Sequence, residues 1–251
     1  MAFLAREGYD SLTLQEFAET ARGLKPPKKR SVLVTFDDGY ADIHAIARSI
    51  ARRYDIKLNL FVTTGFIGRP EPLMMTLDGY YFQTAIADRQ EKPDALGFHI
   101  KKYPHLWRPL NWQEIREMHE DGMGIGLHGH SHRNFARLGP DETEAEIASG
   151  QAALKERLGI TSEFFAFPYG WHDSYRPETL PLFRRHRVQY LFGTHMGRAR
   201  LSRLPEILPR FLIYQQDSLD TFERKLRGAY DFIEPLRLFW DRVKRPLLFG
   251  A

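Results

Sequence analysis

Cysteine is absent from the 251 residues of this chain. Its absence excludes a disulfide framework, a thiolate metal site and a thiol nucleophile, so any metal must be held by histidine and carboxylate. The sequence also lacks an apolar run of membrane-spanning length, and residues 1–14 contain charges in place of a signal-peptide core. We therefore expect no stable membrane insertion and, for the chain as written, a cytoplasmic location. Export would need a segment outside this sequence.

An overall excess of charge is also missing, because the formal net charge is only +4. Locally, residues 184–210 contain seven arginines and one acid, Glu206. Such a cluster suits an anionic polymer or a phosphate, but no aromatic interleaving and no nucleic-acid module accompany it. A solvated arginine-rich face is the favoured interpretation, and we predict no nucleic-acid partner.

The apolar and helical patterns alternate along the chain. Buried strands are predicted at residues 31–36, 57–63, 124–130, 163–167, 189–194 and 207–214, and helices at residues 14–22, 41–53, 112–121, 141–158 and 177–186. This alternation predicts parallel strands in an α/β fold, either doubly wound or closed as a barrel. In both folds the chemistry lies at the carboxyl ends of the strands. Length and composition predict one domain over residues 1–251.

Two segments interrupt the alternation. Residues 68–110 contain five prolines and form an insertion, which we interpret as a lid or a wall of the substrate cleft, with a purely structural excursion as the alternative. Residues 76–88 within it have a helical pattern. Residues 219–251 form an amphipathic helical tail, which we expect to pack on the domain; association with a membrane surface is the less favoured alternative.

Two adjacent aspartates, Asp37 and Asp38, follow the first predicted buried strand and precede Gly39. Side chains alternate along a strand, so one carboxylate can face a metal ion while the other faces a substrate. A turn or a helix cap would explain the same three residues. A divalent cation would offset the repulsion between the two carboxylates.

Three histidines fall within five residues in the stretch Leu127-His128-Gly129-His130-Ser131-His132. Imidazole binds Zn²⁺ and other borderline divalent ions, and two histidines with one carboxylate leave positions open for water and substrate. Asp38, His128 and His132 would supply that set. Single histidines often cap a strand or bond to backbone, but the cluster together with the aspartate pair favours a metal site.

A third motif, Phe167-Pro168-Tyr169-Gly170, ends another predicted strand. A turn there can direct a backbone N–H into the pocket as an oxyanion donor. Sugar rings stack on aromatic faces, so four aromatic residues are candidate cleft walls, although each would also suit the core: Trp107, Trp112, Tyr169 and Trp171.

The three motifs, in this order and spacing, resemble those of the polysaccharide deacetylases, carbohydrate esterase family four. The resemblance extends from about Phe3 to Gly228 and is greatest to the subgroup that acts on exopolysaccharides such as poly-N-acetylglucosamine. It implies a distorted (β/α) barrel and a metal-dependent hydrolase that removes acetyl groups from a carbohydrate, with N-acetyl favoured over O-acetyl.

The resemblance also implies roles for individual residues. Asp37 would be the catalytic base, and Asp38, His128 and His132 the ligands of one divalent metal, usually Zn²⁺, with Co²⁺, Ni²⁺ or Fe²⁺ as alternatives. The backbone N–H of Tyr169 would help to hold the oxyanion. Pro168, Tyr169 and Trp171 would contact the acetylated carbohydrate.

This sequence departs from the family pattern at three places. Gly129 stands where the family commonly has Ser or Thr, and Ser131 is the alternative residue to brace the loop. Phe167 stands where many members have an arginine that orients the catalytic aspartate; Arg210 is the expected substitute. No Leu-x-His motif supplies a general acid, for which His172 and His195 are weak candidates.

Two other functions remain open at this point. One is a related hydrolase of a small amide or cyclic imide, which a closed pocket formed by residues 68–110 would favour. The other is a non-catalytic glycan-binding homologue, which the missing general-acid motif suggests and the complete set of aspartates and histidines opposes. The oligomeric state is not predicted.

Overall fold

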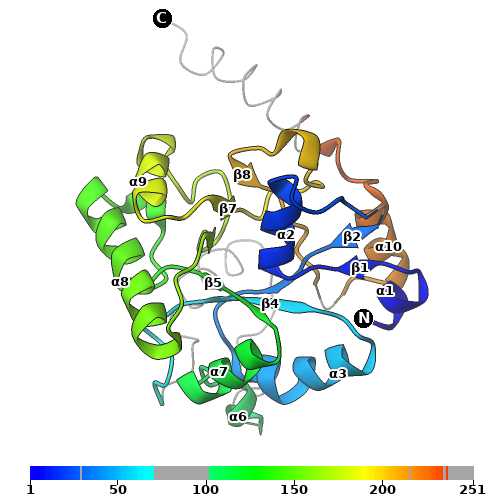
Figure 1. Cartoon of the computed structure of the whole chain (residues 1–251), viewed down its shortest axis with the longest axis horizontal. Helices are drawn as coiled ribbons and strands as arrows, with labels where there is room; N and C mark the ends of the chain where they lie inside the picture. The colour runs from blue at the N-terminus through cyan, green and yellow to red at the C-terminus, as the bar shows by residue number, and fades with distance from the viewer. Residues whose placement is uncertain (29, 71–101, 215, 234–235, 237–251) are drawn as a thin grey trace, which may run out of the picture.

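The computed structural model describes residues 1–28, 30–70, 102–214, 216–233 and 236. Six parallel strands pair in chain order to form one curled sheet, and α3, α7, α8 and α9 lie around its outside (Figure 1). The strands are β3 (Val34–Phe36), β4 (Leu58–Val62), β5 (Gly124–Leu127), β6 (Phe164–Ala166), β7 (Tyr190–Phe192) and β8 (Ile207–Leu208). This arrangement confirms the predicted distorted (β/α) barrel.

Every predicted strand is shorter in the structure, and the strand predicted at 124–130 already ends at Leu127. Two other strands differ most. The strand predicted at 31–36 is interrupted at Leu33: β2 (Ser31–Val32) pairs with β1 (Asp10–Ser11) in a small parallel sheet, and β3 enters the main sheet. The strand predicted at 207–214 was too long, because β8 ends at Leu208. Pro209 follows, and it has no N–H to donate to a neighbouring strand.

The predicted helices are present with small changes at their ends. Capping boxes begin two of them: Thr13 with Glu16, and Asn111 with Glu114. The helix predicted at 41–53 starts as the π-helix η1 and continues as α3, and the helix predicted at 177–186 starts as the 3₁₀ turn η3 (Pro177–Thr179) and continues as α9. The α-helices and η1 are α1 (Ala2–Arg6), α2 (Leu14–Ala21), η1 (Ile43–Ala47), α3 (Arg48–Arg53), α6 (Pro104–Trp107), α7 (Trp112–Glu120), α8 (Pro140–Leu158), α9 (Leu180–Arg185) and α10 (Leu219–Arg227).

The two faces of the sheet are filled by different residues. On one face Phe61, Phe164 and Phe192 pack with Leu14 and Phe17 of α2, so this helix covers the inside of the curled sheet. On the other face a larger core includes side chains from the strands and from α7, α8 and α9. Its largest fully buried members include Phe135, Phe165, Phe167 and Phe183, whose rings are in edge or tilted contact. These contacts fix the strands whose ends form the site.

The described ends of the insertion lie beside the aspartate turn. The N–H of Gly68 donates to the carbonyl of Leu110 at 2.8 Å, and the N–H of Leu110 donates to the carbonyl of Gly39 at 2.8 Å. The insertion therefore leaves and returns next to Asp37 and Asp38. The helix predicted at 76–88 lies outside the described residues.

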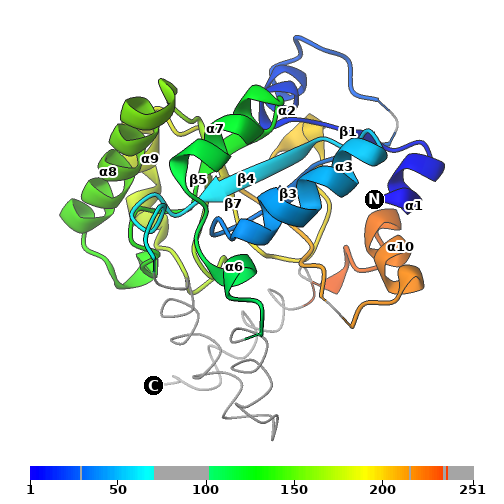
Figure 2. The same ribbon diagram turned by 90° about the horizontal axis from the view of Figure 1, so that it is seen from below.

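The first part of the predicted tail is helical. Helix α10 packs beside α1 (Figure 2), with the rings of Phe3 and Phe222 in edge contact at 5.8 Å. Residues 237–251 lie outside the described part. Within the described part of the chain, no helix has the length and hydropathy that crossing a bilayer requires.

Candidate functional site

The aspartate pair lies in a tight turn directly after β3. The N–H of Gly39 donates to the carbonyl of Asp37 at 2.8 Å, and Asp38 has a left-handed backbone with φ of 71°. Helical backbone resumes at Ala41, and η1, which begins at Ile43, has no side-chain hydrogen bond at its cap. Of the alternative explanation, the turn is therefore present, but neither aspartate caps η1.

Asp38 meets two histidines that follow β5. Its Oδ1 lies 3.2 Å from Nε2 of His128 and 3.1 Å from Nε2 of His132, and both imidazoles are buried. Among the described residues, these three side chains form one group whose possible ligand atoms all lie within 4.8 Å of one another. The structure thus brings together the three residues predicted as ligands.

The donor chemistry of this group fits a divalent ion. Nδ1 of His128 lies 2.8 Å from the carbonyl of Ala166, which can only accept, so a neutral His128 has its Nε2 lone pair directed toward Asp38. Two acceptors at 3.2 Å repel unless a proton or a cation lies between them. Two neutral imidazoles and a carboxylate suit Zn²⁺, and Co²⁺, Ni²⁺ and Fe²⁺ accept the same ligands.

The charges around the group favour a cation. Burial lowers the pKa of His128, but the nearby Asp37 and the hydrogen bond to Asp38 raise it more, so the pKa lies above its usual value. Burial raises the pKa of Asp38, but its bonds to His128 and His132 lower it well below the usual range. The site therefore has a strong preference for positive charge, which a metal ion would satisfy in competition with protons.

Asp37 is held by Arg210, which follows β8. The two guanidinium NH groups donate to Oδ1 and Oδ2 at 2.7 and 2.8 Å. Burial raises the pKa of Asp37, but the charge of Arg210, with that of His128, lowers it by more, so Asp37 stays ionised. The Asp37 side chain is 25% exposed, so a water molecule can reach it. Arg210 is itself fixed by Nε, which donates to the carbonyl of Gly193 at 3.0 Å.

The third motif adds a wall beside His132. The ring of Tyr169 packs edge-on against the His132 ring at 5.1 Å, and Oγ1 of Thr194 donates to the Tyr169 carbonyl at 3.1 Å. Burial raises the pKa of Tyr169, so its hydroxyl stays protonated.

Gly170 must be glycine, because its φ is 71° and a Cβ would lie 2.7 Å from Thr194 Cγ2. Phe167 is fully buried in the core and does not replace the family arginine.

Unusual backbone conformations concentrate at this site. Five described residues other than glycine have a positive φ, and three of them are Asp38, His132 and Tyr169. Left-handed conformations are costly for residues with a Cβ and persist where surrounding contacts enforce them. Each of the three motifs therefore contains one residue with a strained backbone, and all three residues lie at the candidate site.

Glu146 on α8 supports the histidine loop, and sequence reasoning missed it. One carboxylate oxygen accepts from the N–H of His130 at 2.8 Å and of Ser131 at 2.9 Å, and the other bonds the Ser131 hydroxyl. Ser131 thus braces the loop as expected, but through Glu146. The signal was present: Glu146 occupies the buried stripe of α8 with Thr143, Ile147 and Gly150, where an acid is unusual.

The middle histidine of the cluster has a different place. Nδ1 of His130 lies 3.0 Å from Oγ1 of Thr64, which follows β4, and the N–H of Gly65 donates to the His130 carbonyl at 2.8 Å. Thr63, one residue earlier, donates its N–H to the carbonyl of Asp38 at 3.2 Å. The end of β4 therefore lies between the two ligand loops and holds them together.

The remaining candidates are distributed around the site. Trp107 packs edge-on against Tyr40 at 5.9 Å, and Trp112 packs against the main core, so Trp112 is unsuited to a cleft wall. His172 and His195 stack on each other at 3.9 Å, and Nε2 of His195 lies 3.3 Å from the Tyr175 hydroxyl. Neither histidine belongs to the group formed by Asp38, His128 and His132.

The arginine cluster at residues 184–210 does not form one uniform face. Arg210 is directed inward to Asp37, Arg184 pairs with Glu206 at 3.3 Å, and Arg198 pairs with Asp231 at 2.8 Å. Part of the local positive charge is therefore neutralised within the protein.

Comparison with solved structures shows the fold. The Streptococcus pyogenes deacetylase PplD, solved in complex with acetate, is 22% identical and superposes with a TM-score of 0.67 over 89% of this chain and 82% of that one. IcaB from Ammonifex degensii is 22% identical, with a TM-score of 0.67 over 90% and 86% of the two chains. A de-N-acetylase from Aggregatibacter actinomycetemcomitans is 13% identical, with a TM-score of 0.66 over 89% and 86%.

Sequence comparison shows the family. The chain is 23% identical over 199 residues to the Bacillus subtilis (strain 168) protein named "Putative polysaccharide deacetylase YxkH", covering 79% of this chain and 57% of that protein. The chain thus spans less than two thirds of that relative's length. The family model described as polysaccharide deacetylase matches residues 24–191. This chain belongs to the polysaccharide deacetylase family.

Proposed function

We propose that this protein is a metal-dependent deacetylase that hydrolyses an acetamide group on a sugar. One observation supports this function above the others: a buried group of two imidazoles and a carboxylate lies next to a second carboxylate that is ionised and partly open to solvent. A water-activating base beside a metal site is the arrangement that amide hydrolysis requires.

Asp38, His128 and His132 would hold the metal ion. When bound, a divalent ion supplies Lewis-acid chemistry, by which it polarises the acetyl carbonyl and lowers the pKa of water. Glu146 keeps the loop that bears both histidines in place through its bonds to His130 and Ser131.

Asp37 accepts the proton of the attacking water at a carboxylate oxygen. The water oxygen forms a bond to the acetyl carbon, and the backbone N–H of Tyr169 stabilises the negative charge on the carbonyl oxygen. Arg210 keeps Asp37 ionised and fixes its orientation through two hydrogen bonds. The carbon–nitrogen bond then breaks, which leaves acetate and a sugar amine.

We assign the proton that the leaving nitrogen needs to Asp37, which has just received it from water. His172 and His195 are the other titratable candidates, but they stack on each other and His195 bonds Tyr175. Asp37 therefore acts first as base and then as acid, and no separate general acid is needed.

The test is acetate release combined with metal analysis. Purified protein is analysed for bound metal, stripped with a chelator, reloaded with Zn²⁺ or Co²⁺, and assayed on chito-oligosaccharides. We expect activity that is lost on chelation and restored on reloading, and a loss of about 10²–10⁴-fold in Asp37→Asn at unchanged metal content.

Other results would redirect the proposal. Bound metal with acetate release only from small amides would assign the chain to the small-amide hydrolases. Bound metal with glycan binding and no hydrolysis would indicate the non-catalytic homologue. A protein that takes up no metal after reloading would contradict the mechanism.

A further inference from the structure

The two histidines of the candidate metal site, His128 and His132, are supported in different ways. Nδ1 of His128 lies 2.8 Å from the carbonyl of Ala166, and this contact fixes the rotation of its ring. Nδ1 of His132 is buried and has no hydrogen-bond partner among the described residues. A hydrogen bond at Nδ1 therefore orients one imidazole and not the other.

The difference matters for metal binding, because both imidazoles present Nε2 to the carboxylate of Asp38. A neutral imidazole that offers Nε2 to a cation carries its proton on Nδ1. Metal-binding histidines almost always donate that N–H to a carbonyl, a carboxylate or water, and the bond sets the orientation of the ring. In the described part of the chain, the orientation of His132 must come from another contact.

Two aromatic rings contact the imidazole of His132. The ring of Tyr169 meets it edge-on, with 5.1 Å between the centroids and 66° between the planes, and the ring of His128 lies at the same distance and at 62°. Edge-on pairs with centroids about 4.5–7 Å apart attract each other beyond the effect of burial. His132 is only 7% exposed, so little water competes for its surface. The Tyr169 ring can therefore restrict the rotation of the His132 ring.

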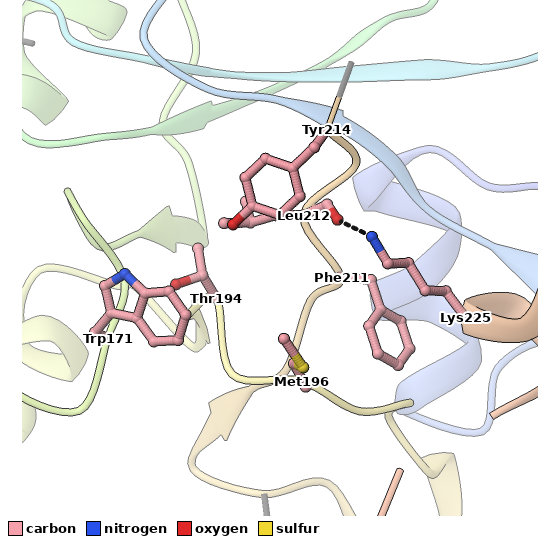
Figure 3. A pocket seen from close by; sticks show the side chains of 7 residues that line it. All are labelled: Trp171, Thr194, Met196, Phe211, Leu212, Tyr214 and Lys225. Atoms are coloured by element: carbon pink, nitrogen blue, oxygen red, sulfur yellow. Dashed lines mark hydrogen bonds between the residues drawn. The ribbon is translucent and has the colours of Figure 1, made fainter. Parts of the chain in front are cut away.

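The loop that bears Tyr169 is itself fixed by the segment after β7. Oγ1 of Thr194 donates to the Tyr169 carbonyl at 3.1 Å, and the N–H of Thr194 donates to the Gly170 carbonyl at 2.8 Å. Thr194 also lies next to Trp171 of the same loop, where both line a small pocket (Figure 3). These contacts hold the loop after β6 against its neighbour, so the Tyr169 ring is a firm support.

We infer that Tyr169 is a positioning residue whose ring holds His132 in the orientation that metal binding requires, in place of a hydrogen bond at Nδ1. This role belongs to the side chain and is separate from the role proposed for the backbone N–H of Tyr169, which a change of side chain leaves in place. The inference rests on the proposed function, because it assumes that Asp38, His128 and His132 bind a metal ion.

The test measures metal affinity in place of activity. Zn²⁺ is titrated into the metal-free wild type, Tyr169→Leu and Tyr169→Phe in competition with a chromogenic chelator. We expect Tyr169→Leu to bind Zn²⁺ about 3–10-fold more weakly, because one aromatic pair contributes about that factor. Tyr169→Phe keeps the ring, so its affinity should stay within about twofold of the wild type. Neither leucine nor phenylalanine is branched at Cβ, so neither adds a new conflict with the φ of 67°.

Tyr190→Leu is the matched control for a purely structural effect. Tyr190 on β7 is half-buried, and its ring contacts the rings of Phe17 at 5.4 Å and Phe164 at 5.3 Å in the smaller core. Urea denaturation of the metal-free proteins should show a loss of stability in both leucine variants, but only Tyr169→Leu should lose Zn²⁺ affinity. The visible absorption of bound Co²⁺, which depends on ligand geometry, should change in Tyr169→Leu and not in Tyr190→Leu.

Three results would overturn the positioning role while the proposed function stands. The first is a Zn²⁺ affinity in Tyr169→Leu equal to that of the wild type. The second is an equal loss in Tyr169→Phe, which would assign the effect to the hydroxyl. The third is an equal loss in Tyr190→Leu, which would assign it to general stability. A wild type that takes up no metal would overturn the positioning role and the proposed function together.

Discussion

Two buried polar clusters lie on strands of the same sheet and differ in how well they are satisfied. Asn59 on β4 is fully buried, and its amide makes three hydrogen bonds to backbone: with the N–H of Leu14 at 2.7 Å and the carbonyls of Leu12 and Val34 at 3.0 and 3.2 Å. Near the other end of the strands, Asp38 shares one oxygen with two histidines, and Nδ1 of His132 has no hydrogen-bond partner among the described residues.

We interpret the Asn59 cluster as structural and the Asp38 cluster as the candidate metal site. A buried amide with all its partners stabilises the contact between α2 and the sheet and requires nothing more. A buried group of ionisable side chains with an unpaired nitrogen and strained backbone is stable only because its surroundings enforce it. Three variants test this distinction, beginning with the largest expected effect.

Arg210→Gln removes the charge that keeps Asp37 ionised. We expect kcat/KM for acetate release to fall about 10²-fold, because the base loses its orientation. Without the guanidinium, burial raises the pKa of Asp37, so the acid side of the pH–rate profile should move to higher pH. A profile that keeps its position would show that Arg210 does not set the protonation of Asp37.

Glu146→Ala removes the brace under the histidine loop. We expect metal affinity, measured by competition with a chromogenic chelator, to fall about 10–100-fold, as for other groups that orient metal ligands. Glu146→Gln is the matched control, because its amide oxygen can accept from both N–H groups and its nitrogen can donate to Ser131. Equal losses in both variants would mean that charge, and not the brace, is what the metal site requires.

Asn59→Leu breaks the structural cluster. It leaves the N–H of Leu14 and two carbonyls without their partner, so we expect the free energy of unfolding to fall by at least about 2 kcal/mol in urea denaturation. Metal affinity and the pH–rate profile of the folded protein should stay as in the wild type. A loss of metal affinity here would remove the distinction between the two clusters.

Much of the fold follows from local patterns. Strands β4, β5, β6 and β7 lie within predicted apolar runs, because strands buried on both faces have no polar alternation to obscure them. The two strand limits that were predicted least well, at Leu33 and at the end of β8, depend on how the strands pair in the folded chain. Leu33 separates two strands because the chain changes sheets there, and β8 is short because Pro209 follows it.

The site was predictable where chemistry depends on residue type and spacing, as for Asp38, His128 and His132. Two aspects of the site could not be predicted from the sequence pattern. The positive φ of Asp38 and Tyr169 arises from contacts between separate strand ends. Glu146 meets the loop only after α8 has packed on the sheet, although its place among buried positions was a usable signal.

Arg210 also affects the architecture of the barrel. In the described sheet β3 and β8 are the two edge strands, and no backbone pairing joins them. The guanidinium spans this seam: it bonds Gly193 after β7, Oγ1 of Thr35 on β3 at 3.3 Å, and Asp37. Arg210 and Asp37, the proposed base, thus also form a cross-link between the ends of the first and last strands. Substitution of Arg210 or Asp37 would therefore weaken both the proposed hydrolysis and the contact between the ends of β3 and β8. Each position has to meet both requirements, so fewer residues are tolerated there than catalysis or stability alone would allow.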